Sequence, residues 1–165
     1  DTIYRFIVAG FHYGAHVVDF LQEPVVMRMF ELKRKVGNEA HFHVAFIRFA
    51  NMPGDVLVSH IEPKSNALTL VAPHFSDRLP SENWMIIDDK RKIACIHPKD
   101  GTNYLRYLTD EEFDTLQKTE EYTDTYTDLW KTFFHAVGIK ERENYICQRN
   151  LFPKWKRKHA VEFRE

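Results

Sequence analysis

The sequence has little of several features that define common protein classes. Its two cysteines, Cys95 and Cys147, form no Cys-x-x-Cys pair, which argues against a disulfide scaffold and favours a reducing, cytoplasmic setting. Only six Gly and seven Pro occur in 165 residues, which excludes fibrous and linker-like chains. No apolar run approaches the roughly 18–20 residues needed to cross a bilayer, so no membrane association is expected.

The chain also lacks a strong net charge. Lys and Arg total 23 against 24 Asp and Glu, so any contact with nucleic acid must come from a local patch. The charges are segregated: residues 110–128 hold eight acids and one base, whereas residues 140–158 hold seven bases and two acids. The seven bases are Lys140, Arg142, Arg149, Lys154, Lys156, Arg157 and Lys158.

The composition predicts one globular domain over residues 1–165, with 44% hydrophobic and 28% charged residues. Because the chain starts without Met or a signal peptide, as if inside a structural element, we expect it to be the C-terminal part of a longer parent protein. Aromatic residues reach 14%, enough for a dense core with rings left over for the surface.

The hydrophobic periodicity predicts an α+β domain. Val25, Met29, Leu32 and Val36 mark one face of a helix that Gly37-Asn38 should end. Alternation then predicts strands, and a helical pattern returns around Leu68 and past Thr109. The expected strands are 41–49, 56–61, 84–87, 93–96 and 104–108. The expected helices are 2–11, 25–36, 66–79, a stretch past 109 and 144–151, with 153–160 as a final turn or helix. We therefore predict an antiparallel sheet of about five strands, with two hairpins, and helices packed on one face.

The C-terminal basic segment is the first candidate for function. Arg149, Lys154, Trp155, Lys156 and Arg157 combine cations, which neutralise phosphates, with a ring that can stack on unpaired bases. Lys140 and Arg142 precede this segment. The alternative is a solvated basic end whose Trp155 and Phe152 dock on the core.

A second candidate lies on the helix after the first hairpin. His74 and Arg78 are one helical turn apart and could bind a phosphate or carboxylate, with His74 moving protons and Asp88 or Arg91 completing a site. Alternatively, Arg78 pairs with an acid such as Asp88, and His74 merely fills space.

The remaining candidates for a functional or structural role are three histidines and an arginine in an otherwise apolar stretch. His41 and His43 would point the same way on a strand, with His60 as a third metal ligand, but no carboxylate or thiolate has a metal-site spacing, so neither a metal nor a cofactor is expected. Arg48 lies among apolar residues and is expected to pair with an acid inside the fold.

Several stretches together resemble one known family, over roughly residues 20–163. They are Glu39-Ala40-His41, Phe46-Ile47-Arg48-Phe49, Ile61-Glu62-Pro63, Ala72-Pro73-His74-Phe75-Ser76-Asp77-Arg78, Asn83-Trp84-Met85-Ile86-Ile87-Asp88-Asp89, Leu129-Trp130-Lys131-Thr132-Phe133-Phe134 and Gln148-Arg149. This pattern resembles the domain of unknown function carried by "probable DNA metabolism proteins". The resemblance implies association with a radical-SAM protein of DNA modification or repair, and kinship to a domain fused to uracil-DNA-glycosylase-like proteins; it implies no catalytic residues.

The leading expectation is an accessory nucleic-acid-binding module of DNA repair or modification that works with a radical-SAM or glycosylase-type partner. Its expected ligand is DNA, single-stranded or distorted. One alternative is an enzyme that acts on a nucleotide or damaged base through His74 and Arg78, and the other is a protein-interaction module. The sequence leaves open whether the protein is an enzyme.

Overall fold

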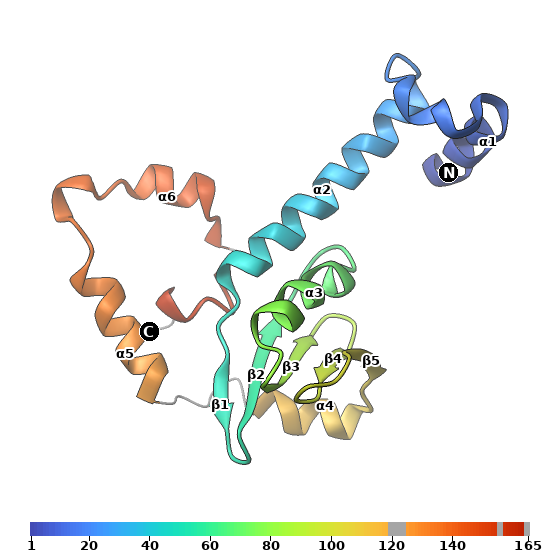
Figure 1. Ribbon diagram of the computed structural model, residues 1–165. Coiled ribbons are helices and arrows are strands. Elements are labelled where there is room, and N and C mark those ends of the chain that lie inside the picture. The colour runs from blue at the N-terminus through green and yellow to red at the C-terminus, as the bar shows by residue number, and fades with distance from the viewer. Residues whose placement is uncertain (119–124, 155–156, 164–165) are drawn as a thin grey trace.

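The computed structural model describes residues 1–118, 125–154 and 157–163 (Figure 1). The chain begins with α1 (Thr2–Tyr13) and the 3₁₀ helix η1 (Gly14–Asp19), and both lie at the far end of the long helix α2 (Pro24–Phe46). Pro24 occupies the start of α2, where a missing backbone N–H costs nothing. The tip formed by α1 and η1 therefore stands well away from the sheet.

Helix α2 corrects two predictions. It continues through Gly37-Asn38 as far as Phe46, so the expected helix stop and the expected strand 41–49 are both wrong. The cause is tertiary packing. Ala40, Val44 and Ile47 join a core cluster with α3, while Phe42 and Phe46 pack on the ring of Phe152. These partners make the helical period more favourable than the alternating one.

The five-stranded sheet is confirmed, but it is mixed rather than purely antiparallel. Its strands are β1 (Ala50–Met52), β2 (Val56–Ile61), β3 (Asn83–Asp88), β4 (Ile93–His97) and β5 (Tyr104–Tyr107), in that spatial order. Strands β2 and β3 run parallel, and the other pairs are antiparallel. The pair is parallel because α3 (Leu68–Arg78) carries the chain back to the end of the sheet where β2 begins, so β3 starts beside the first residue of β2. This connection contains Pro73 inside the helix.

The two expected hairpins, β1–β2 and β3–β4, are both present. In the first, the turn contains Gly54 and Asp55 at positive φ angles of 92° and 55°, a conformation that glycine and aspartate tolerate better than most residues. The first strand of this hairpin is not the expected one: most of 41–49 belongs to α2, and β1 begins only at Ala50, directly after that stretch.

Helices contribute to both faces of the sheet rather than to one. On the first face, Leu68, Val71 and Phe75 of α3 pack with Trp84 and Ile86. On the second, Phe113 of α4 (Asp110–Gln117) packs with Val58, Ile87 and Ala94. Thr109 and Glu112 form a reciprocal capping box that starts α4.

The C-terminal arm consists of α5 (Thr125–Ala136), the 3₁₀ helix η3 (Lys140–Arg142) and α6 (Tyr145–Leu151), followed by the short helix η5 (Val161–Phe163). Figure 1 shows the arm on the β1 side of the sheet, opposite β5. Phe152, which is buried, stacks on Phe46 and fixes the end of the arm to α2. Among the described residues, no helix has both the length and the apolar character required to cross a membrane.

Candidate functional site

The cations of the C-terminal arm are exposed, as the nucleic-acid hypothesis requires. Lys140, Arg142, Arg149 and Lys154 all lie at the surface, and within the described part of the chain none of them pairs with a carboxylate. Trp155 and Lys156 lie outside the described residues.

Arg157 and Lys158 are held by the protein itself. The Arg157 guanidinium lies 4.5 Å from the ring centroid of Phe163 and 5.6 Å from that of Phe152, and its Nε donates to the Phe152 carbonyl at 3.0 Å. Lys158 Nζ donates to Glu62 Oε2 at 2.6 Å. Arg157 and Lys158 therefore already have partners within the protein. The cations that precede them in the sequence remain available to bind phosphates.

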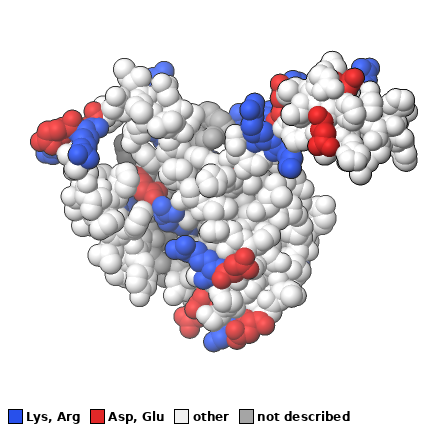
Figure 2. Space-filling view, turned by 45° about the horizontal axis from the view of Figure 1, so that its top comes forward, with Lys and Arg blue, Asp and Glu red and all other residues white. Residues whose placement is uncertain are grey.

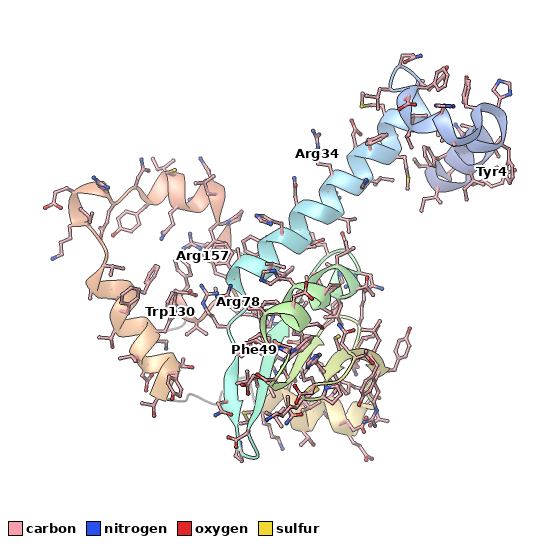
Figure 3. All side chains as sticks on the ribbon, in the orientation of Figure 1. Tyr4, Arg34, Phe49, Arg78, Trp130 and Arg157 are labelled. Atoms are coloured by element: carbon pink, nitrogen blue, oxygen red, sulfur yellow. The ribbon has the colours of Figure 1, made fainter. Side chains whose placement is uncertain are left out.

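The basic residues do not form one unbroken surface on the face shown in Figure 2. Lys and Arg side chains lie there in separate groups, and several have an acidic side chain beside them. Figure 3 shows Arg34 of α2 and Arg157 on the side where α2 and the arm diverge. A strand of nucleic acid would thus meet spaced cations and not a dense basic groove.

His74, Arg78 and Asp88 are not assembled by any described contact. His74 and Arg78 are exposed on α3, whereas Asp88 at the end of β3 is fully buried. Asp88 accepts hydrogen bonds from the backbone N–H groups of Lys90 and Arg91 and from the Arg91 guanidinium at 2.8 Å.

Arg91 uses the same guanidinium to hold a neighbouring loop. It donates to the carbonyls of Pro63 and Lys64 at 3.0 and 2.7 Å. Asp88 and Arg91 therefore tie the β3–β4 turn to the loop after β2, which is a structural task.

The acid partner expected for Arg48 is confirmed. Arg48 Nη2 lies 3.0 Å from Oε1 of Glu162, and its guanidinium lies 4.9 Å from the ring centroid of Trp130. Trp130 Nε1 donates to the same Glu162 oxygen at 2.8 Å. This trio joins the end of α2 to α5 and η5.

A cluster that sequence reasoning did not identify lies at the carboxyl ends of the parallel strands. His60 and Glu62 come at the end of β2, and Asp89 directly follows β3. His159 reaches them from the C-terminal segment. In open sheets, the carboxyl ends of parallel strands are the usual place for a ligand crevice.

This cluster is well defined geometrically. The Nδ1 atom of His60 hydrogen-bonds Oδ1 of Asp89 at 2.8 Å, and the two side chains are only 4% and 5% exposed. The Nε2 atom of His159 lies 3.9 Å from both Asp89 Oδ2 and Glu62 Oε2. Four titratable side chains, from the end of β2, the residue after β3 and the C-terminal segment, thus lie close together.

A pocket opens beside the cluster, and we call it the carboxyl-end pocket. It lies between the last turns of α2, the end of β2 and the C-terminal segment. Its lining includes Glu39, Phe42, His43, Phe46, His60, Glu62, Lys158 and His159.

Two carboxyl groups of the pocket are held in their charged form. The hydrogen bond from Lys158 lowers the pKa of Glu62 below its ordinary value, despite some burial. Burial acts to raise the pKa of Glu39, but hydrogen bonds from Ser65 and the backbone N–H of Lys64 outweigh it and lower the pKa.

The histidine arrangement that a metal site would have required is not present among the described residues. Because residues 41–46 are helical, His41 and His43 do not point the same way: His41 is exposed and His43 lines the pocket. Within the part of the chain that the structure describes, no three His, Cys, Asp or Glu side chains are placed to hold a metal ion.

The comparison with family models gives one match, to a domain of unknown function designated DUF4130, over residues 1–162. The chain belongs to this family. No curated protein and no solved structure matches the chain. The family description names no activity, so DUF4130 membership leaves function to be argued from the site.

Proposed function

We propose that this DUF4130 protein is an accessory nucleic-acid-binding module of DNA repair or modification, and that it acts with a radical-SAM or glycosylase-type partner. The observation that carries the proposal is the set of exposed cations on the C-terminal arm, Lys140, Arg142, Arg149 and Lys154, which no described carboxylate neutralises. Cations in this state can exchange their counterions for DNA phosphates.

Exposed rings on the same arm support an unpaired strand as the ligand. Tyr126 and Phe133 of α5 and Tyr145 of α6 are 73%, 53% and 72% exposed. Aromatic rings next to cations stack on bases of any sequence when those bases are unpaired. The wide spacing of the cations suits weak contacts, which tethering to a partner enzyme would make sufficient. The repair context rests on the family resemblance alone.

The test is a fluorescence-anisotropy titration of labelled single- and double-stranded DNA at several salt concentrations. Arg149→Glu combined with Lys154→Glu should weaken single-strand binding about tenfold at low salt and reduce the slope of log affinity against log salt by about 1.4. The matched control is Lys99→Glu, an exposed lysine in the loop after β4 and outside the arm, which should bind like the wild type.

Two outcomes would overturn the proposal. The wild-type protein could fail to bind DNA even at low salt, or the double charge reversal could bind as tightly as the wild type. The second outcome would favour the protein-interaction alternative, which the exposed apolar side chains of α1 also support. Those side chains are Ile3, Tyr4, Ile7, Val8 and Phe11.

A further inference from the structure

The C-terminal segment, residues 157–163, ties the arm to the sheet. Its last helix, η5, lies between α5 and the end of α2, where Glu162 accepts a hydrogen bond from Trp130 of α5 at 2.8 Å (Figure 1). Lys158 and His159, a few residues earlier, reach the carboxyl ends of the parallel strands. A contact that strengthens the sheet side of this segment therefore also holds α5 against the core.

His159 lies at the centre of the sheet-side contact. Its side chain is 12% exposed, and its Nε2 atom lies 3.9 Å from both Asp89 Oδ2 and Glu62 Oε2. The Asp89 side chain is 5% exposed, and its Oδ2 makes no hydrogen bond to any described residue. A separation of 3.9 Å is short enough for an ion pair and too long for a hydrogen bond. His159 therefore supplies a cationic partner to Asp89 only when its imidazole ring is protonated.

The charges around His159 favour a proton on this ring. The groups that face it come from α2, from the ends of β2 and β3, and from its own segment. They are Glu39 and His43 of α2, His60 and Glu62 at the end of β2, Asp89 and Lys90 after β3, and Lys158 beside it in sequence.

Among these groups, Asp89 is the carboxylate that lacks a cation. Lys158 donates to Glu62 at 2.6 Å and so largely neutralises it. The hydrogen bond of His60 to Asp89, at 2.8 Å, is one that a neutral imidazole can donate. A buried carboxylate is costly unless it is paired, so an imidazolium at position 159 provides the charge that Asp89 lacks.

We propose that His159 is a proton-sensitive latch for the C-terminal arm. When its ring is protonated, it closes on Asp89, with Glu62 as a second carboxylate partner, and holds the C-terminal segment and α5 on the sheet. When the ring is neutral, this ion pair is lost, and the segment is held by its other contacts alone, those of Lys158 and Glu162 among them.

The direction of the pH effect follows from the sign of the charge. Histidine is the side chain whose charge ordinarily changes between pH 5 and 8, whereas aspartate is ordinarily ionised throughout this range. A contact that needs the protonated imidazole is present at the lower end of the range and is lost as the pH rises. The arm should therefore be attached more firmly at pH 6 than at pH 8, whether or not it binds nucleic acid.

The first experiment is limited proteolysis of the full chain with thermolysin at pH 6 and pH 8, with cleavage within residues 125–163 followed by mass spectrometry. Each variant is compared with the wild type at the same pH, so the pH dependence of the protease cancels. His159→Gln should be cleaved about fivefold faster than the wild type at pH 6 and at the wild-type rate at pH 8. The matched control is His41→Gln, an exposed histidine of α2, which should match the wild type at both pH values. His43 and His60 remain in every variant, so their own titration does not produce the difference.

The second experiment uses a variant with a permanent charge. His159→Lys places a cation beside Asp89 at every pH in the range, so at pH 8 the arm should be about fivefold better protected than in the wild type. Circular dichroism at both pH values shows whether each variant is folded, and the lysine variant decides the question if the glutamine variant is not. The proposal is wrong if His159→Gln is cleaved at the wild-type rate at pH 6, or if its excess cleavage is equal at pH 6 and pH 8, which would indicate a packing role. It is also wrong if His159→Lys gives no added protection at pH 8.

Discussion

The sheet core and the outlying helices differ sharply in how their side chains are used. In the core, Ile86, Ile87 and Ala94 are completely buried, and Trp84 is 1% exposed. By contrast, α1, α5 and α6, which the structure describes in full, contain no buried residue. All three helices are rich in apolar residues. An apolar pattern therefore predicts where a helix lies but not whether it is buried; burial requires a partner surface, which also supplies most of the stability of a helix this short.

The two regions meet at a small set of contacts. Phe152 stacks on Phe46 with ring centroids 4.4 Å apart, and Glu162 binds both Arg48 and Trp130. Lys158 adds its bond to Glu62 at the edge of the carboxyl-end pocket. The arm that carries the proposed DNA contacts is therefore attached to the core through the same segment that lines the pocket.

The largest expected effect is in the core. Trp84→Ala should lower the free energy of unfolding by about 3–5 kcal/mol, because it leaves a cavity among Phe49, Phe75 and His97. Ile146→Ala on α6 removes an apolar side chain that is 77% exposed and should change it by less than about 0.5 kcal/mol. Urea denaturation followed by circular dichroism measures both values. Similar costs for the two variants would show that the core and the arm do not differ in how much their side chains stabilise the fold.

A smaller effect is expected at the junction of the two regions. Arg48→Met leaves Glu162, which is 4% exposed, without its ion-pair partner and should cost about 2–3 kcal/mol. The arm should also become more sensitive to trypsin, and the fluorescence of Trp130 should shift toward that of an exposed indole. Arg142→Met, which removes an exposed cation with no described partner, is the control. An unchanged digestion pattern for Arg48→Met would show that the arm does not depend on this trio.

The effect of Glu39 should depend on pH. Its pKa is lower in the folded protein, so its stabilising contribution is present above the unfolded-state pKa and is lost as pH falls through the folded-state pKa. Glu39→Gln should cost about 1 kcal/mol at pH 7 and almost nothing at strongly acidic pH. Glu31→Gln, on the exposed side of α2, should cost little at either pH. Thermal melts at pH 7 and in acid provide the measurement, and a cost that persists in acid would contradict the assignment.

The smallest expected effect is a difference in chemical labelling between the two cysteines, Cys95 in the sheet core and Cys147 on the arm. Burial raises the pKa of the Cys95 thiol to about 11, so little reactive thiolate forms near neutral pH. Cys147 is exposed on α6. We expect a thiol reagent at pH 8 to label Cys147 rapidly and Cys95 only when the protein unfolds, as read by mass spectrometry. Equal labelling rates in the folded protein would show that the core opens as readily as the arm.

Much of the fold followed from local pattern. The strands at 56–61, 84–87, 93–96 and 104–108 were predicted within a residue or two, since their apolar runs are bounded by turn residues such as Gly54. The helix around Pro73 was also predicted. The failures were the extent of α2 and the parallel pairing of β2 with β3, because both depend on packing between segments distant in sequence.

The candidate sites divide in the same way. Exposure of the arm cations could be anticipated from a run of Lys and Arg, and an internal partner for Arg48 from its apolar surroundings. The cluster of His60, Asp89 and His159 gave no sequence signal. His60 and Asp89 lie 29 positions apart and meet only because their strands are adjacent and parallel, and His159 arrives from the far end of the chain.

By itself, the sequence determined four of the five strands and most helices, since these depend on periodicity and turn chemistry over a few neighbouring residues. Only the tertiary structure decided which way the strands run, how far α2 extends and where the polar side chains converge. The physical reason is distance along the chain: hydrogen bonds, ion pairs and ring contacts between remote segments have no local pattern, and they exist only once the chain has closed on itself.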